Sequence, residues 1–192
     1  IGNANLYRTD GTVFNSYAAK LHSFEAIVEV GEFGLLAIFL IHILTATLLK
    51  LRSSRARGSK YAVSASKGGS SKSSVISRNM MVSGFLLLFF VVVHVKQLHF
   101  GPGIVDGYVT SVDGHESRDI YRLVVETLKD PVNLVFYMFS MIVLGAHLRH
   151  GFWSAFQSLG LSCERSSKFL YAVALGLAVL LAGGFFFIPV WI

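Results

Sequence analysis

The chemistry of this sequence is concentrated in histidines that interrupt long apolar runs. His147 lies inside the apolar run at residues 133–161, and His150 follows it by about one helical turn. His42 and His94 interrupt two other apolar runs. An imidazole in hydrocarbon surroundings is costly unless something binds it, so each of these side chains is a candidate functional residue.

The segments that carry these histidines are long enough to cross a membrane. The chain has 192 residues, of which 53% are hydrophobic and only 15% charged, unlike a typical soluble domain. About 20 apolar residues in a helix cross about 30 Å of hydrocarbon. We therefore predict an all-α, polytopic transmembrane helix bundle that forms a single membrane domain over residues 1–192. Its spans are expected at residues 30–49, 80–97, 132–153 and 169–189.

The charge distribution predicts the orientation of these spans. The loop at residues 50–78 contains basic residues and no acidic ones, which places it in the cytoplasm under the positive-inside rule. This charge also suits docking of an acidic soluble subunit or anionic lipid. The loop at residues 98–130 has an acidic excess, as expected of an outer loop. Because the basic excess is explained by topology, no role in nucleic-acid binding is expected.

Local signals predict how the spans begin and what flanks them. Residues 1–23 are polar and turn-rich, which indicates an extramembrane segment, and Ser23 is a candidate N-cap for the first span. Residues 120–128 have one apolar face, which predicts a short amphipathic helix on the membrane surface. Asp130 followed by Pro131 is typical of a helix start.

Both ends of the chain are expected on the outer side of the membrane. The loop after the first span is expected in the cytoplasm, and an even number of spans, four, returns the chain to the side on which it began. The sequence begins at Ile1, and its first residues show neither an initiator Met nor the charged and apolar regions of a signal peptide. We therefore expect a further transmembrane helix before Ile1. The single cysteine, Cys163, excludes an internal disulfide and a cysteine-based metal site.

Depth in the membrane sorts the histidines. His42 is about 12 Å and His147 about 9 Å from the cytoplasmic surface, whereas His94 is about 24 Å from it. A haem between two helices requires one imidazole from each at matched depth, and His42 with His147 meets that requirement. His94 has no such partner in the chain, since the other histidines lie in or beside extramembrane segments. Interhelical hydrogen bonding is the alternative for these side chains, and zinc is disfavoured because further ligands are missing at that depth.

Several motifs carry a family resemblance that extends over essentially the whole chain. They are LLAIFLIHIL, the KYAV of the basic loop, LLLFFVVVHVKQLHF, DIYRLVVETLKDP and, most specifically, AHLRHGFWSAFQSLGL. With these motifs the chain resembles the membrane cytochrome b subunit of succinate:quinone oxidoreductase (succinate dehydrogenase or fumarate reductase) in its single-subunit, two-haem form.

The resemblance implies five helices with four axial histidines, of which the first helix is missing from the numbered sequence. It implies two haem b groups, one held by His42 and His147, the other by His94 and a ligand outside the numbered residues. Arg149 and His150 would then reach a haem propionate. A flavoprotein subunit and an iron–sulfur subunit are expected on the cytoplasmic face of a bacterial cytoplasmic membrane, with membrane lipid around the chain. The quinone is expected to be menaquinone, and a higher oligomer of the complex is left open.

Quinone reduction also moves protons, so a carboxylate near the outer haem is a candidate acid or base. Glu29 and Glu32 lie at about the right depth, and Lys96 and His99 are alternatives as propionate partners or quinone-oxygen donors. Two rival functions use the same residues differently. A haem-free membrane anchor or transporter would use the histidines as polar contacts between helices, and the cytochrome b anchor of another dehydrogenase or a hydrogenase would bind haem without succinate oxidation.

Overall fold

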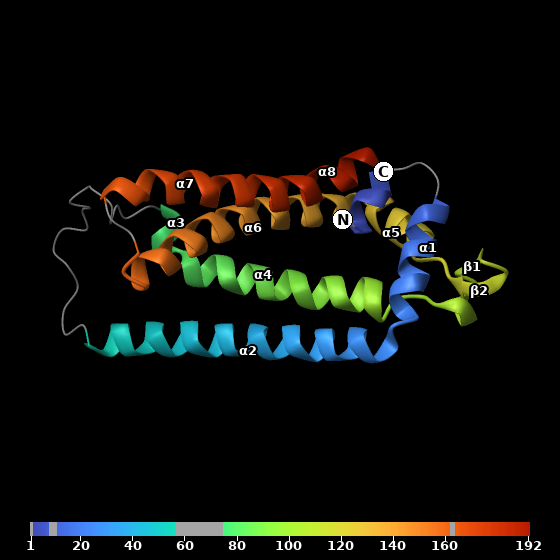
Figure 1. The fold of residues 1–192 in the computed structure, drawn as a ribbon, viewed down its shortest axis with the longest axis horizontal. Coiled ribbons are helices and arrows are strands. Elements are labelled where there is room, and N and C mark those ends of the chain that lie inside the picture. The colour runs from blue at the N-terminus through green and yellow to red at the C-terminus, as the bar shows by residue number, and fades with distance from the viewer. Residues whose placement is uncertain (1, 8–10, 57–74, 162–163) are drawn as a thin grey trace. The chain divides into compact units, whose positions relative to one another are not determined.

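Helices make up most of the computed structural model, which describes residues 2–7, 11–56, 75–161 and 164–192 (Figure 1). In this described part of the chain, four helices are long and apolar enough to cross a membrane: Glu25–Ala56, Met80–His99, Pro131–Ser158 and Ser166–Trp191. The predicted all-α class with four spans is therefore confirmed, and each helix is longer than its predicted span. The chain forms two compact units, one of Ile1–Ala19 with Ser74–Ile192 and the other of Lys20–Ser73.

The smaller unit consists mainly of α2, Glu25–Ala56. Its 32 residues span about 48 Å, so it exceeds the thickness of the hydrocarbon, and its last turns carry basic side chains. The expectation that Ser23 caps this helix is wrong. The Ser23 hydroxyl donates instead to the carbonyl of Lys20, 2.7 Å away, at the end of the preceding helix. Residues 57–74, the centre of the predicted basic loop, lie outside the described residues.

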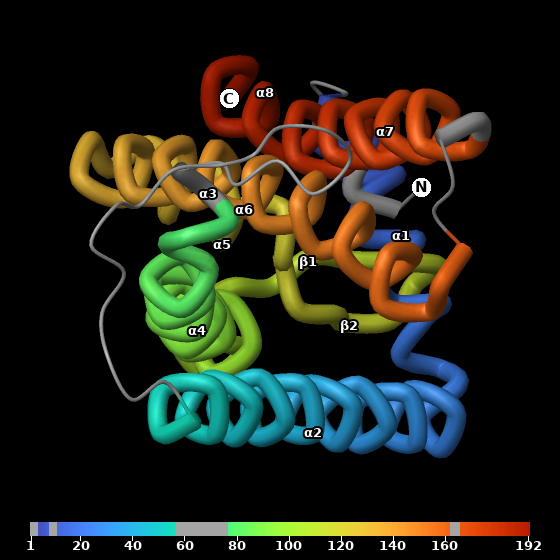
Figure 2. Tube along the Cα trace, turned by 90° about the vertical axis from the view of Figure 1, so that its left-hand side faces the viewer, coloured from blue at the N-terminus to red at the C-terminus, as the bar shows by residue number. Residues whose placement is uncertain are grey.

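The larger unit is built around α6, Pro131–Ser158, which packs against α4 on one side and against α7, η5 and α8 on another (Figure 2). The predicted start of α6 is confirmed, because the Asp130 carboxylate accepts a hydrogen bond from the Asn133 amide with Pro131 in the first turn. The other long elements of this unit are α4 (Met80–His94), the π-helical turn η3 (Val95–His99), α7 (Glu164–Ala178), the π-helical turn η5 (Val179–Gly183) and α8 (Gly184–Trp191).

Small side chains form the contact between α6 and the last span. Ala174, Ala178 and Ala182 recur every four residues and are all buried. A Cβ atom added at Gly145 of α6 would lie 3.2 Å from the Cβ of Ala182. In a bilayer, such small residues let two helix backbones approach closely enough for van der Waals attraction to hold them together.

Short elements cover the end of the larger unit that holds both its N-terminus and Trp191. They are η1 (Gly2–Tyr7), the first part of α1 (Gly11–His22), η4 (Ile104–Asp106), β1 (Val109–Val112), β2 (His115–Arg118) and α5 (Ile120–Lys129). The short helix α3 (Val75–Arg78) lies at the opposite end of the unit, before the start of α4 (Figure 1). Residues 2–7 and 11–22 are thus helical, which corrects the prediction of a turn-rich segment. They are held by specific contacts, since the Asn15 side chain donates to the Asp119 carboxylate and the Tyr7 hydroxyl donates to the Gly184 carbonyl.

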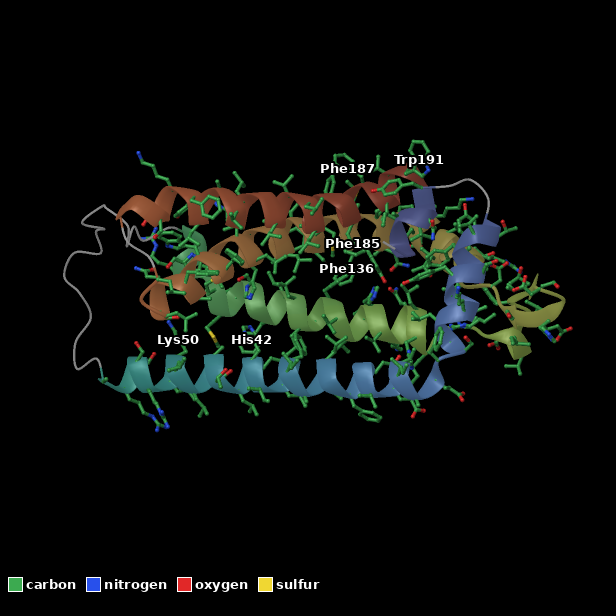
Figure 3. All side chains as sticks on the ribbon, viewed as in Figure 1. His42, Lys50, Phe136, Phe185, Phe187 and Trp191 are labelled. Atoms are coloured by element: carbon green, nitrogen blue, oxygen red, sulfur yellow. The ribbon has the colours of Figure 1, made fainter. Side chains whose placement is uncertain are left out.

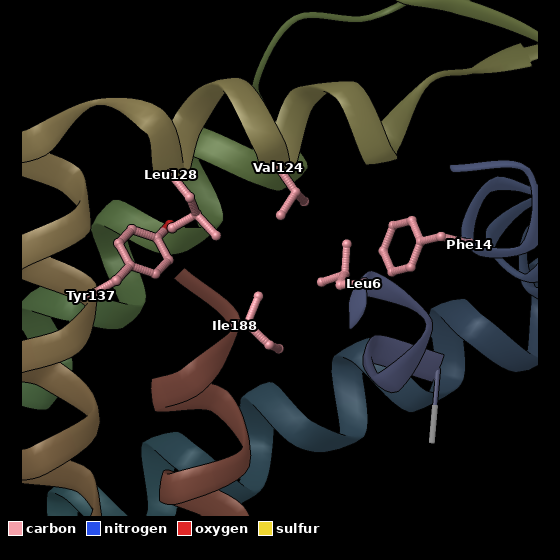
Figure 4. Packing of buried hydrophobic residues seen from close by; sticks show 6 residues of the cluster. All are labelled: Leu6, Phe14, Val124, Leu128, Tyr137 and Ile188. Carbon is pink, nitrogen blue, oxygen red and sulfur yellow. The ribbon is translucent and has the colours of Figure 1, made fainter. Parts of the chain in front are cut away.

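An apolar cluster fixes these covering elements to the long helices. Figure 4 shows Leu6 and Phe14 packed towards Val124 and Leu128 of α5 and Ile188 of α8, with Tyr137 of α6 at the side. The predicted amphipathic helix is confirmed as α5. Its apolar face is buried in this cluster within the protein, and its position at the membrane surface stays a prediction.

A β-hairpin that the sequence analysis did not predict holds the end of the second span. β1 and β2 pair antiparallel, and Arg118 at the end of β2 donates hydrogen bonds to four backbone carbonyls. Those carbonyls belong to Leu98, His99, Gly101 and Pro102. One planar guanidinium thereby satisfies carbonyl groups that the end of a helix leaves without intrahelical partners.

The small-residue contact yields a matched pair of variants. Gly145→Leu should lower the thermal unfolding midpoint of the purified protein in detergent, because the new side chain has no room against Ala182 and overpacking costs about 1–3 kcal/mol. Gly176→Leu is the control, since a Cβ atom at Gly176 meets nothing within 4 Å. Equal midpoints for the two variants would contradict the close approach of α6 and the last span.

The contact between the hairpin and α5 should be acid-sensitive. A hydrogen bond from Tyr108 and a 2.7 Å salt bridge with Arg122 lower the pKa of Glu126 below its ordinary value. A lowered pKa in the folded state stabilises the contact above the ordinary carboxyl pKa, and this contribution disappears as pH falls through the lowered value. The protection factors of the hairpin amides against hydrogen exchange should therefore fall below about pH 4. Glu126→Gln should remove this acid step and Glu116→Gln should retain it; the reverse would contradict the assignment.

Candidate functional site

His147 is held between α6 and α4 by a short chain of hydrogen bonds. Its Nδ1 atom lies 2.9 Å from the Ser83 hydroxyl oxygen, and that hydroxyl donates to the Met80 carbonyl at 3.0 Å. The ring lies beside Gly84, where an added Cβ atom would be 3.8 Å from His147 Cε1. α4 therefore presents two small residues, Ser83 and Gly84, to the imidazole, and one of them bonds it.

His94 lies on α4 at a second level of the same unit. It is eleven residues beyond Ser83, so it lies about 16 Å further along the helix than the contact with His147. Its Nδ1 atom is buried and has no hydrogen-bond partner among the described residues. Buried polar side-chain atoms are usually hydrogen-bonded, so an exception marks a place where a further group is expected to bind.

A cavity of about 330 Å³ adjoins His94. Its lining is mainly apolar and comes from η1, α4, η3, α5, α6 and α8. The centroids of the Phe90 and Tyr137 rings lie 5.5 and 5.9 Å from that of the His94 ring. Figure 3 shows two of the phenylalanines near this region, Phe136 and Phe185, in the space between α4, α6 and α8, whereas Phe187 and Trp191 lie on the outer side of α8. A half-buried histidine whose Nδ1 atom is buried beside an apolar cavity fits the axial ligation of haem b. Among the described residues, His94 is the one histidine in the lining.

The backbone changes from α-helix to π-helix directly after His94. The turn at Val95–His99 shifts the helix register by one residue, a feature often found at functional sites. Within it, Gln97 accepts a hydrogen bond from the Tyr137 hydroxyl at 3.0 Å and donates to the Asn133 side chain at 2.9 Å. This polar chain joins α6 to the π-helical turn and positions Tyr137, which lines the cavity.

The side chains expected to help at the outer site are placed differently. Lys96 and His99 are exposed, and neither lines the cavity beside His94. The His99 ring packs on Phe100 with centroids 4.6 Å apart, while its carbonyl accepts a hydrogen bond from Arg118. Their roles as propionate partners or quinone donors stay predictions.

Arg149 and His150 follow His147 towards the other end of α6. The Arg149 guanidinium lies 5.4 Å from the centre of the Tyr171 ring, which in turn packs on Trp153. Arg149 thus faces α7, whereas His147 faces α4, so the two side chains leave α6 on different sides. His150 is half-buried. The predicted propionate role is untested for both residues.

The smaller unit carries the remaining predicted site residues on α2. His42 lies eight residues before Lys50, so it is about 12 Å from the basic end of the helix (Figure 3). The single hydrogen of the Thr45 hydroxyl is shared between the Ile41 carbonyl, 2.7 Å away, and the His42 carbonyl, 3.1 Å away. Glu29 and Glu32 are exposed on the acidic half of α2. The pairing of His42 with His147 stays a prediction from their depths.

Sequence reasoning missed the polar residues that accompany the histidines. Ser83, Gln97, Asn133 and Tyr137 belong to the spans or their ends, and each bonds a partner on another helix or turn. The available signal was their depth, because Ser83 lies near the start of its span at the level expected for His147, and Gln97 lies one turn beyond His94.

Comparison of the chain with protein-family models, with curated proteins and with solved structures finds no match. The functional argument therefore rests on the residues themselves: two histidines at two levels of one unit, each with its own surroundings, and a third on α2.

Proposed function

We propose that this chain is the membrane-anchoring, haem b-binding subunit of a succinate:quinone oxidoreductase in a bacterial cytoplasmic membrane. The observation that carries the proposal is the buried, unpartnered His94 nitrogen beside an apolar cavity, about 16 Å along α4 from the level of His147. Two imidazoles at two levels suit two redox centres stacked across a bilayer. The sequence motifs around His147 connect this arrangement to the succinate:quinone family.

Each part of the chain has a task in this proposal. His42 and His147 would hold one haem b near the basic, cytoplasmic end, and His94 would hold the second with a ligand outside the numbered residues. Haem b bound at these positions supplies one-electron transfer between the iron–sulfur subunit and quinone. The apolar side chains around His94 exclude water from the ligand nitrogen. The flavoprotein subunit, which interconverts succinate and fumarate, would dock with the iron–sulfur subunit at the basic end.

A pyridine haemochrome assay on the complex purified from its native membrane tests the cofactor. Two haem b per copy of this chain are expected. His42→Ala and His147→Ala should each lose the same haem, and His94→Ala should lose the other. His115→Ala, in the hairpin, is the control and should keep both. A complex without haem would overturn the proposal in favour of a haem-free anchor, and haem without copurifying succinate oxidation would indicate another dehydrogenase.

Quinone turnover tests the proposed acid–base groups separately. Glu29→Gln and Glu32→Gln should slow succinate-dependent quinone reduction while leaving the haem spectra unchanged, because neither residue is a proposed ligand and proton transfer contributes about 10²–10⁴-fold to such rates. Glu25→Gln, one turn earlier on the same helix, is the matched control. Unchanged turnover in both test variants would exclude these carboxylates.

A further inference from the structure

The hydrogen bonds of Ser83 determine which nitrogen of His147 carries the proton. A serine hydroxyl has one hydrogen to donate and lone pairs to accept with. The Ser83 hydroxyl donates that hydrogen to the Met80 carbonyl, 3.0 Å away. Its 2.9 Å contact with His147 Nδ1 is therefore a hydrogen bond only if the oxygen accepts and Nδ1 donates. Of the two tautomers of the neutral imidazole, only the one with the proton on Nδ1 allows both bonds.

This tautomer has its lone pair on Nε2, the atom that would face a metal ion. We propose that Ser83 is a positioning residue that holds His147 in the Nδ1–H tautomer and orients its ring for ligation through Nε2. The statement about ligation rests on the proposed function, whereas the statement about the tautomer rests on the hydrogen bonds alone. A partner on the second nitrogen of a ligating histidine fixes the ring and raises its basicity.

The surroundings of the ring support this assignment. The imidazole lies beside Gly84, the neighbour of Ser83, where an added Cβ atom would be in ordinary van der Waals contact with Cε1. Met80 and Ser83 lie in the first turn of α4, where backbone and hydroxyl are three residues apart. The carbonyl that orients the hydroxyl thus belongs to the same helix, and the relay from Met80 to His147 needs no further group.

The two proposed ligands, His147 and His94, differ in the hydrogen bonding of their Nδ1 atoms. His147 Nδ1 is bonded to Ser83, while His94 Nδ1 has no partner in the described part of the chain. Loss of the Ser83 hydroxyl should therefore affect His147 and leave His94 unchanged. A less basic ligand stabilises oxidised iron less, so the midpoint potential of the haem at His147 should become more positive.

Three variants distinguish the effect of losing the Ser83 hydroxyl from the non-specific effects of a substitution. Ser83→Ala removes the bond, and Ser83→Thr retains a hydroxyl at the same position. Ser140→Ala is the matched control, because the hydroxyl of the buried Ser140 of α6 donates to the Phe136 carbonyl within its own helix. Among the described residues, no hydrogen bond joins this hydroxyl to a histidine.

The tautomer is read first, from ¹⁵N chemical shifts of histidine-labelled full-length chain in lipid without haem, with His147 identified by its loss in His147→Ala. The unmodified chain, Ser83→Thr and Ser140→Ala should show protonated Nδ1, and Ser83→Ala should show a mixture of tautomers. Protonated Nε2 in the unmodified chain, or a Ser83→Ala spectrum identical to it, would overturn the inference.

Redox titration of the purified complex is the second readout. Ser83→Ala should shift the midpoint potential of one of the two haems to a more positive value. The affinity for haem at that site should fall about 10–100-fold. Ser140→Ala should shift neither. Haem that binds normally with both potentials unchanged in Ser83→Ala would overturn the positioning role but leave the proposed function intact. A haem-free complex would overturn the proposed function, while the ¹⁵N result would still decide the tautomer.

Discussion

The rest of this structure depends on the free-energy cost of burying the polar nitrogens of imidazoles among apolar helices. A histidine in such surroundings needs a hydrogen bond or a ligand, and the larger unit provides for each of its two intramembrane histidines differently. His147 bonds to Ser83 of the neighbouring helix, whereas His94 keeps a buried nitrogen beside an apolar cavity. The first arrangement orients a ring, and the second leaves a nitrogen at the wall of a cavity, where we propose that haem binds.

The position of α6 between its neighbours makes both arrangements possible. On one side Gly145 and the alanines of the last span permit close packing, which fixes α6 laterally. On the other side α6 carries His147 to Ser83 and Tyr137 to Gln97, at two levels of the same neighbouring helix. A rigid contact on one face of α6 thus supports polar contacts on the other, because the interaction of small residues leaves little freedom for rotation of the helix.

The covering elements complete the site at His94. Arg118 satisfies the carbonyls at the end of the π-helical turn, and α5 with η1 closes the cavity from the end of the long helices. These segments have polar sequences, yet they bury Leu6, Phe14 and Leu128 in a common apolar cluster. Leu6, Val124 and Leu128 of these segments therefore cover one end of the cavity.

Local properties of the sequence were sufficient for the four spans, the amphipathic α5 and the start of α6 at Asp130 and Pro131, since hydropathy, helical periodicity and capping depend on neighbouring residues. The same properties indicated the histidines as site residues and sorted them by depth. Only the tertiary structure decided what the apolar face of α5 packs against, that residues 2–7 and 11–22 fold as helices, and that Ser83 bonds His147. The physical reason is sequence separation: the hydroxyl and the imidazole are 64 residues apart, so no local pattern encodes their contact.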